Sequence, residues 1–262
     1  MSPDTSSRAT VVATVTLVDR PHLIQAITTL DTLHSTVNTS SWAVVGGLMV
    51  QLLCAEAGVD GARVTDDTDL AVDVFSDRAS LKGLTGQLRQ MGFVDGTPDS
   101  TTGHSRMSYR WIRDGLKFDL MVPKKANRQR SPARTVTGKP AVEFGGVQQA
   151  VSRSEVVEIR VRGTSVTGQV RRPNIVGAIV IKSVAGVADT RDTRRHWEDL
   201  VLLGQICANR GDLPEIRNSL TPADRRRICR VQERIPSSMF SGLDGQESRE
   251  VLKLLGQAPR GR

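Results

Sequence analysis

The chain has 262 residues, of which 38% are apolar and 24% charged, so it is long enough to bury a substantial globular core. This composition excludes fibrous, collagenous and wholly disordered proteins. Lysine and arginine outnumber the acidic residues by 36 to 28, a net charge of +8. The protein therefore either binds a polyanion such as RNA, DNA or a nucleotide, or has a basic surface that serves only solubility.

Cysteine spacing and apolar runs exclude further classes. Cys54, Cys207 and Cys229 show no CxxC spacing and no histidine cluster nearby, which argues against a disulfide framework and a structural zinc site. The apolar run 11–18 contains two threonines and precedes no cleavage pattern, and no run approaches the roughly 20 apolar residues of a membrane span. We therefore expect a cytoplasmic protein without a membrane association.

Apolar periodicity predicts strands and helices in alternation. A helix is expected over 21–33, and the apolar run 42–45 predicts a strand that leads through Gly46-Gly47 into a helix ending at Gly58. The next expected elements are a strand at 68–75, a helix at 81–91, and strands at 105–112 and 117–122 that an Asp114-Gly115 hairpin turn joins.

The second half of the chain changes character. Residues 123–139 are rich in lysine and arginine and contain two prolines, which predicts an exposed basic loop. Strands are then expected at 156–161 and 168–172, and helices at 174–187, 196–208, 213–220, 223–235 and 249–255. The pattern predicts an α/β (α+β) fold, a mixed sheet with flanking helices plus a carboxyl-terminal helical domain. The expected divisions are an amino-terminal extension and helix at 1–34, an α/β domain at 35–172 and a helical domain at 173–262.

Three aspartates are the candidates for metal binding. Asp67 and Asp69 begin a predicted strand and, being two residues apart, point to the same face, where their oxygens would suit Mg²⁺. Asp119 lies in a mostly apolar strand, where an acid is costly unless it is ligated or paired, although an outward-facing position on an edge strand is the alternative. A single Asp-x-Asp pair proves little by itself.

The glycine pair gives these acids a context. The helix after Gly46-Gly47 would offer free amides and a positive dipole end to a phosphate, although an ordinary turn would also explain the glycines. The order strand, Gly-Gly, helix, Asp-x-Asp strand, hairpin and Asp strand is much less easily produced by accident than any one of its parts.

A late helix adds a cation. Lys182 and its neighbour Ser183 are the only strongly polar residues between 175 and 188. Lys182 either extends its head to water or is a buried cation that faces the carboxylates and binds phosphate. The arginines that follow, from Arg191 on, either form a solvated helix face or include one that reaches a triphosphate. Asp199 either holds this arrangement through an ion pair or is a surface acid.

These motifs resemble the nucleotidyltransferase superfamily, and within it the AbiEii-like and MenT-like toxins of bacterial toxin–antitoxin systems. The resemblance spans about 160 positions, 41–203. It is carried by Val44-Val45-Gly46-Gly47, Arg63-Val64-Thr65-Asp66-Asp67-Thr68-Asp69-Leu70, Lys117-Phe118-Asp119 and the stretch from Lys182 through Arg191 to Asp199-Leu200. The Gly-Gly and Asp-x-Asp parts indicate the superfamily, and the Arg-x-Thr-x-Asp-x-Asp form and the late helix pair indicate the toxin branch.

The resemblance implies a nucleotidyltransferase fold and a metal-dependent enzyme. It would transfer a nucleoside monophosphate from an NTP to the 3′ end of tRNA and so block translation, with a cognate antitoxin as a partner. The expected metal ligands are Asp67, Asp69 and Asp119, for two Mg²⁺ ions, with Asp119 also a candidate general base. The expected nucleotide-binding residues are Gly46, Gly47, Arg63, Thr65, Lys182 and Arg191. Asp66 departs from the family pattern and leaves open which two of the three adjacent acids bind.

The acceptor is the least determined part. The basic loop and the four arginines Arg225, Arg226, Arg227 and Arg230 would suit a phosphodiester backbone, whereas the scarcity of aromatic residues, 3%, argues against base stacking. Two alternatives stay open: a nucleotidyltransferase that acts on a small molecule such as an aminoglycoside, and a catalytically inactive basic RNA-binding protein. Phosphoryl transfer to a protein hydroxyl is a weaker third.

Overall fold

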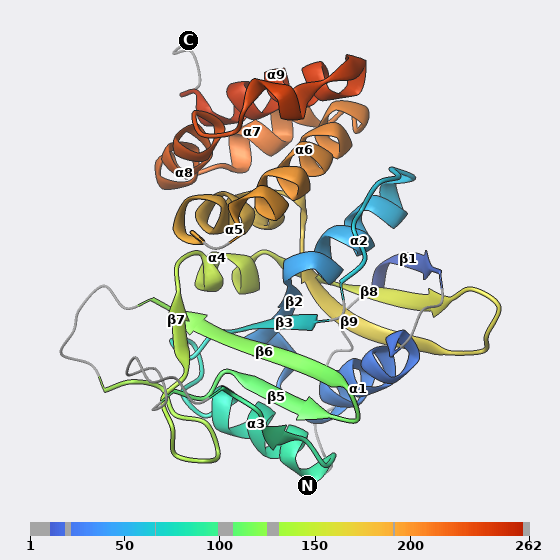
Figure 1. The fold of residues 1–262 in the computed structure, drawn as a ribbon, viewed down its shortest axis with the longest axis vertical. Coiled ribbons are helices and arrows are strands. Elements are labelled where there is room, and N and C mark those ends of the chain that lie inside the picture. Colours follow the sequence, from blue (N-terminus) through green and yellow to red (C-terminus); the bar gives the residue numbers. More distant parts are fainter. Residues whose placement is uncertain are drawn as a thin grey trace, which may run out of the picture.

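Two mixed β-sheets and a set of helices make up the described part of the chain, so the fold is mixed α/β as predicted (Figure 1). The computed structural model describes residues 11–18, 22–65, 67–98, 107–124, 131–190 and 192–258. Within these ranges, no helix combines the length and the apolar character that crossing a membrane requires.

The larger sheet holds the strands of the motifs. Its order is β2-β3-β6-β5-β4, and β7 also pairs with β6. Its strands are β2 (Trp42–Val45), β3 (Asp67–Val72), β4 (Val94–Asp95), β5 (Arg110–Arg113), β6 (Leu116–Pro123) and β7 (Val142–Phe144). β3 runs parallel to β6 and antiparallel to β2. The predicted turn between β5 and β6 is present, because Asp114 and Gly115 both adopt positive φ, 48° and 84°, as a two-residue hairpin requires.

The smaller sheet has the order β1-β8-β9. It consists of β1 (Val11–Leu17), β8 (Ser154–Val161) and β9 (Thr167–Pro173). β1 runs parallel to β8, so the segment expected to be an extension is a strand of this sheet. Along β1, Val15 and Leu17 are buried while Thr14 and Thr16 are exposed, the alternation of a half-buried strand.

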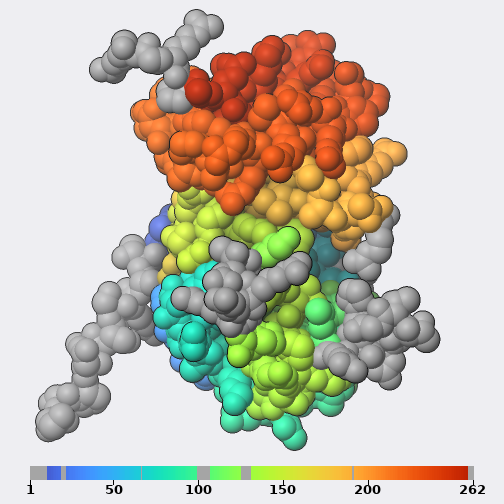
Figure 2. All heavy atoms as spheres, turned by 90° about the vertical axis from the view of Figure 1, so that its left-hand side faces the viewer, coloured from blue at the N-terminus to red at the C-terminus, as the bar shows by residue number. Residues whose placement is uncertain are grey.

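Helices flank both sheets and gather at one end of the molecule. They are α1 (Leu23–Thr36), α2 (Gly46–Ala57), α3 (Ser80–Gln90), α4 (Val147–Ser152), α5 (Ile175–Ala188), α6 (Thr193–Asn209), α7 (Leu213–Ser219), α8 (Pro222–Gln232) and α9 (Gly242–Gly256), with 3₁₀ turns at Thr39–Ser41 and Ser237–Phe240. Figure 2 shows α6 to α9, in orange and red, at one end. The predicted helices are confirmed, whereas α4, β4 and β7 were not predicted and α9 begins earlier than expected.

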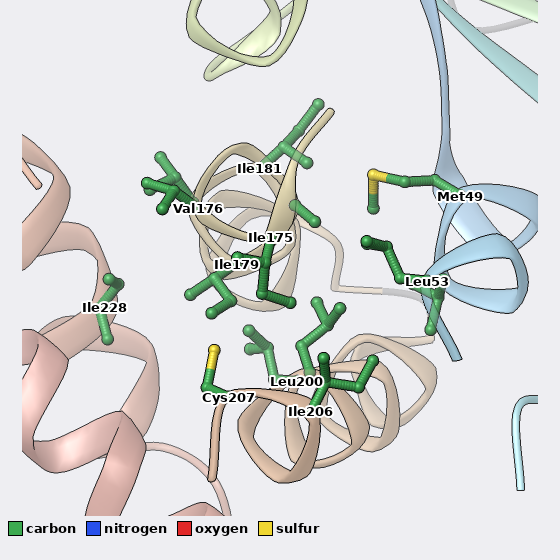
Figure 3. Close-up of a cluster of buried hydrophobic side chains, with 14 of the residues drawn as sticks. Met49, Leu53, Ile175, Val176, Ile179, Ile181, Leu200, Ile206, Cys207 and Ile228 are labelled. Atoms are coloured by element: carbon green, nitrogen blue, oxygen red, sulfur yellow. The ribbon is translucent and has the colours of Figure 1, made fainter. Parts of the chain in front are cut away.

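The two faces of the larger sheet bury side chains in different cores. Alternate residues such as Leu70 and Phe118 pack with α1 and α3, whereas Ala71 on the other face packs with α4, α5 and α6. Figure 3 shows how this second core continues into the carboxyl-terminal helices, with Met49 and Leu53 of α2 directed toward α5 and α6. Apolar burial of this extent, worth roughly 1.5–3 kcal/mol per large side chain, fixes α5 and α6 over the sheet.

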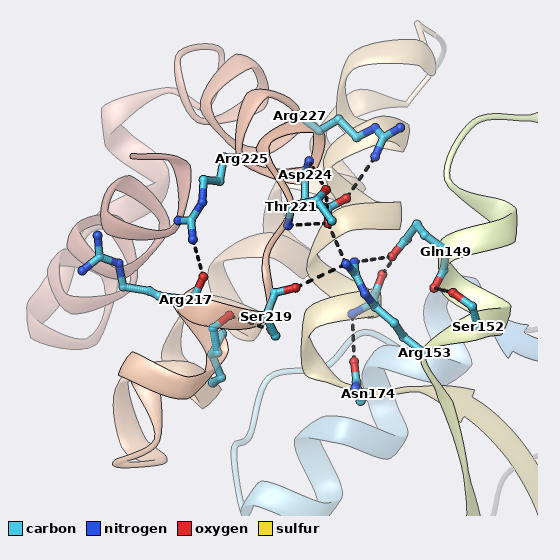
Figure 4. Close-up of polar contacts among 12 residues, drawn as sticks. Gln149, Ser152, Arg153, Asn174, Arg217, Ser219, Thr221, Asp224, Arg225 and Arg227 are labelled. Carbon is cyan, nitrogen blue, oxygen red and sulfur yellow. Dashed lines mark hydrogen bonds and ion pairs between the residues drawn. The ribbon is translucent and has the colours of Figure 1, made fainter. Parts of the chain in front are cut away.

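A polar junction also joins α8 to α4. Arg153, directly after α4, donates to Asp224 over 2.7 Å and to the side chain of Gln149 over 2.9 Å (Figure 4). Asp224 is itself part of a capping box with Thr221 at the start of α8. This junction holds α8 against the α/β part of the chain.

Candidate active site

The three candidate aspartates lie on one face of the larger sheet. In the parallel pair β3–β6, Asp69 is directly opposite Asp119, and Asp67 is opposite Lys117. Residues paired across neighbouring strands point to the same face, as do residues two apart on one strand. An Asp119 on the opposite face would have excluded a shared site. The three carboxylates instead share the face that α4 and α5 cover, at its polar end.

The glycine pair lies against Asp69 and the Arg-x-Thr segment. A Cβ atom on Gly46, whose φ is +68°, would lie 1.8 Å from Oδ2 of Asp69. A Cβ atom on Gly47 would lie 2.9 Å from Cγ2 of Thr65 and 3.1 Å from Nη2 of Arg63. The structure therefore brings these five predicted residues together at the start of α2. Glycine is needed here to make room for the chain's own carboxylate and threonine.

Thr65 has a local role within this group. Its hydroxyl donates to the main-chain carbonyl of Asp67 over 3.1 Å, which fixes the chain just before β3. Gln51 of α2 donates to the carbonyl of Arg63 over 2.5 Å from the other side. These bonds hold the Arg-x-Thr segment against the first turn of α2.

Asp69 is the carboxylate whose ionisation is most perturbed. Burial, and next the neighbouring Asp119 carboxylate, raise the pKa of Asp69 from 3.8 to about 6. The positive charges of Lys182 and Arg195 act in the opposite direction. The shift therefore reports a site in which acids and bases from β3, β6, α5 and α6 influence one another.

Lys182 is a buried cation, one of the two alternatives that the sequence left open. Its side chain is 3% exposed, and its ammonium donates to Oδ2 of Asp199 over 2.5 Å. Asp199 is buried on α6 and also lies 3.7 Å from Nε of Arg63. Burial lowers the pKa of Lys182, and Asp199 opposes that shift. Asp199 therefore braces the two predicted phosphate ligands, Lys182 and Arg63.

The arginines that open α6 differ in direction. Arg194 pairs with Glu198 and is 79% exposed, so it belongs to the solvated face. Arg195 donates to Asp189 over 2.8 Å, and its charge acts on Asp69. Arg195 therefore pairs with Asp189, and its charge also favours the ionised form of Asp69; sequence reasoning did not single it out. The predicted ligand Arg191 lies outside the described residues, as does Asp66.

His196 of α6 is a buried histidine that lies beside Asp189. Its Nε2 lies 3.1 Å from Oδ2 of Asp189. Burial, and next the Lys182 charge, lower the pKa of His196 from 6.5 to about 4. The imidazole is therefore neutral at physiological pH.

Arg110 and Lys117 complete the polar face, and sequence reasoning missed the first of them. Arg110 on β5 donates from Nε to Oδ1 of Asp119 over 2.8 Å and from Nη2 to Oδ2 over 2.6 Å. The same Nη2 lies 3.3 Å from Oδ2 of Asp67, and the Lys117 ammonium lies 3.5 Å from Oδ1 of Asp67. The hairpin could have revealed this pair, because a two-residue turn at 114–115 places position 110 opposite 119.

The three aspartates have the oxygen ligands that a divalent metal prefers, and their side chains share one face of the sheet. Oδ1 of Asp67 is buried and forms no hydrogen bond to a described residue, although the Lys117 ammonium lies 3.5 Å from it. Their present arrangement does not fit, since among the described residues no three histidine, cysteine, aspartate or glutamate side chains form a group that could hold a metal ion. The guanidinium of Arg110 lies between Asp67 and Asp119 instead.

The predicted RNA-binding arginines of α8 are not equivalent. Arg225 is buried, 7% exposed, and donates to main-chain carbonyls of Leu255, Gln257 and Arg217, so it is unavailable to a polyanion. Arg226 and Arg230 are exposed one helical turn apart. Residues 125–130 of the predicted basic loop 123–139 lie outside the described residues.

No protein-family model matches this chain, and comparisons with curated proteins and with solved structures give no match either. The resemblance to nucleotidyltransferases therefore depends on the motifs and on the geometry that they adopt.

Proposed function

We propose that this protein is a metal-dependent nucleotidyltransferase that transfers a nucleoside monophosphate from an NTP to the 3′ end of tRNA and so blocks translation. The observation that carries the proposal is the register of Asp69 opposite Asp119, with Asp67 on the same face and Gly46 at the start of α2 against Asp69. In-line attack on an α-phosphate needs acids that hold divalent metal and, beside them, a place for the phosphates, which a helix that begins with glycine would provide.

The cations near this cluster suit the triphosphate. Lys182 and Arg63 share Asp199, so each retains hydrogen-bonding capacity toward a phosphate while its position is fixed. Arg195 adds a third positive charge from α6. A divalent metal, held by the three aspartates, would supply the remaining charge neutralisation and activate the attacking hydroxyl. The protein's own side chains then bind and orient the triphosphate.

RNA is the acceptor that the charges favour. The net charge is +8, and Arg226 and Arg230 present an exposed basic pair on α8. A cationic small acceptor would need an acid beyond the three that are proposed to hold the metal, whereas the nearby Asp199 is already engaged with Lys182. A tRNA acceptor end bound through its backbone is therefore the better substrate.

The test uses each of the four NTPs, labelled at the α-phosphate, with total tRNA or with small hydroxylated acceptors. We expect label in tRNA, and we expect Asp69→Asn to abolish it. Asp60→Asn is the matched control because Asp60 is exposed and lies outside the site. Labelling of a small molecule alone would overturn the choice of acceptor.

An inactive RNA-binding protein is the second candidate, and one observation favours it. Arg110 neutralises two of the three carboxylates, as expected of a site that no longer holds metal. If expression of the wild-type protein and of Asp69→Asn inhibits growth equally, binding without chemistry is the better explanation. A cognate antitoxin should relieve the inhibition in either case.

A further inference from the structure

The guanidinium of Arg110 forms ion pairs with both Asp67 and Asp119. Its Nε and Nη2 form a two-pronged contact with both oxygens of Asp119, at 2.8 and 2.6 Å, and Nη2 extends to Asp67 at 3.3 Å. Arg110 on β5 is directly opposite Asp119 on β6, and Asp67 lies on β3, two residues before the partner of Asp119. The contact is therefore built into the sheet and does not depend on a loop.

This contact competes for the same oxygens as a metal ion. Forked arginine–carboxylate pairs are among the stronger hydrogen-bonded contacts in proteins, because both donors align with both oxygens. Each oxygen of Asp119 is used in this way, and one oxygen of Asp67 also faces the same guanidinium. A divalent ion that took these oxygens as inner-sphere ligands would meet the positive guanidinium at contact distance.

The carboxylates need some cation whenever metal is absent. Asp69 and Asp119 face each other across neighbouring strands, so their negative charges repel one another. Arg110 is 27% exposed and Asp119 18%, so the pair is accessible from solvent and its side chains have room to separate. A purely structural pair at this exposure would contribute little to stability.

We propose that Arg110 is a resident cation that holds the place of a divalent metal in the metal-free protein, and that metal entry requires its fork to leave Asp119. This inference rests on the proposed function, since it assumes that the carboxylates bind metal. The apparent metal affinity is then lowered by the fraction of molecules in which Arg110 is disengaged. If the fork is closed in about nine molecules of ten, the apparent affinity falls about tenfold.

Binding of Mn²⁺ without NTP or RNA tests the competition, with free Mn²⁺ measured by electron paramagnetic resonance. Arg110→Gln removes the charge and should bind Mn²⁺ about tenfold more tightly than the wild-type protein. Arg110→Lys keeps the charge but cannot fork, so its affinity should be intermediate. Arg160→Gln is the matched control, since Arg160 makes an exposed pair on β8 with the same loss of charge, and it should bind as the wild type does.

The outcomes separate this inference from the proposed function. Equal or weaker Mn²⁺ binding by Arg110→Gln overturns the resident-cation role while nucleotidyl transfer by the wild-type protein still stands. Absence of binding in every variant overturns both the inference and the metal dependence.

A measurement on the wild-type protein covers the case in which Arg110→Gln does not fold. In an NMR spectrum of arginine Nε–H groups, the Arg110 signal should move toward that of a free guanidinium as Mg²⁺ is added. An Arg110 signal that stays unchanged while Mg²⁺ binds overturns the proposal.

Discussion

Gly46→Ala adds a single carbon atom at the point where α2 begins beside Asp69. The new atom would lie 1.8 Å from Oδ2 and 2.6 Å from Cγ of Asp69, more than an ångström short of ordinary contact with the oxygen. The backbone there has φ +68°, a left-handed conformation that costs alanine about 1–2 kcal/mol. Overlap with a packed neighbour adds about 1–3 kcal/mol, so we expect Gly46→Ala to lower the free energy of unfolding by about 2–5 kcal/mol.

Gly58→Ala isolates the overlap from the backbone penalty. Gly58 ends the same helix with φ +66°, and a Cβ atom there would meet nothing within 4 Å. Gly58→Ala should therefore cost only the backbone contribution, about 1–2 kcal/mol, and leave nucleotidyl transfer unchanged. Urea unfolding of both variants gives the stability difference, and the labelled-NTP assay gives the activities.

Activity should separate the two variants further than stability does. The added atom must displace the Asp69 carboxylate or the start of α2, and a misplacement of about 1 Å in a catalytic group can cost about 10²-fold in rate. We expect Gly46→Ala to lose at least that factor. Unfolding of both variants at the same urea concentration, with Gly46→Ala transferring nucleotide as fast as Gly58→Ala, would refute the proposed contact between position 46 and Asp69.

Three further predictions concern the residues around the site. Lys182→Met leaves Asp199 buried without its closest cation and should lower the free energy of unfolding, measured in urea, by about 3–5 kcal/mol. The double variant Lys182→Met with Asp199→Leu should regain most of that stability but no activity. Equal stability of the single and the double variant would contradict the buried pair. His196 has a pKa of about 4 in the folded state against 6.5 in the unfolded state, so the folded state binds fewer protons and stability is lost as pH falls from 6.5 to 4. This loss, on the order of 3 kcal/mol, should be absent in His196→Gln when unfolding is measured at pH 7 and pH 4.5. The same change of stability with pH in both proteins would refute it. In filter binding, Arg226→Gln should lower the slope of log affinity for tRNA against log salt concentration by about 1. Arg225→Gln should destabilise the fold without changing that slope, because Arg225 is buried. The reverse pattern would show that Arg225 contacts RNA.

Much of the fold could be predicted because its elements have strong periodicity. The Trp42–Val45 strand, the helix that ends at Gly58 and the hairpin turn at 114–115 follow from apolar runs and from positions that favour positive φ. The strand β1 was missed although its apolar and polar residues alternate, because its partner β8 lies far along the chain. Elements as short as β4 and β7 carry too few residues for any period to show.

The candidate site was predictable in its acids and less so in its cations. The shared face of Asp67 and Asp69 follows from the pleat, whereas the register that puts Asp119 on that face is set by the pairing of β3 with β6 and had to come from the structure. The direction of an arginine depends on tertiary packing, so sequence could not tell that Arg225 is buried. Arg110 is the exception, because a two-residue turn at 114–115 already places position 110 opposite Asp119.

A comparison of NTPs labelled at the α- or the γ-phosphate decides whether the protein transfers a nucleotide to tRNA. Incubation of the wild-type protein with tRNA, Mg²⁺ and α-labelled NTP should label the tRNA at its 3′ end, and γ-labelled NTP should leave it unlabelled, because the α-phosphate is transferred and pyrophosphate is released. Label that enters a protein or RNA from the γ-phosphate, or tRNA that stays unlabelled with all four α-labelled NTPs, would contradict the account.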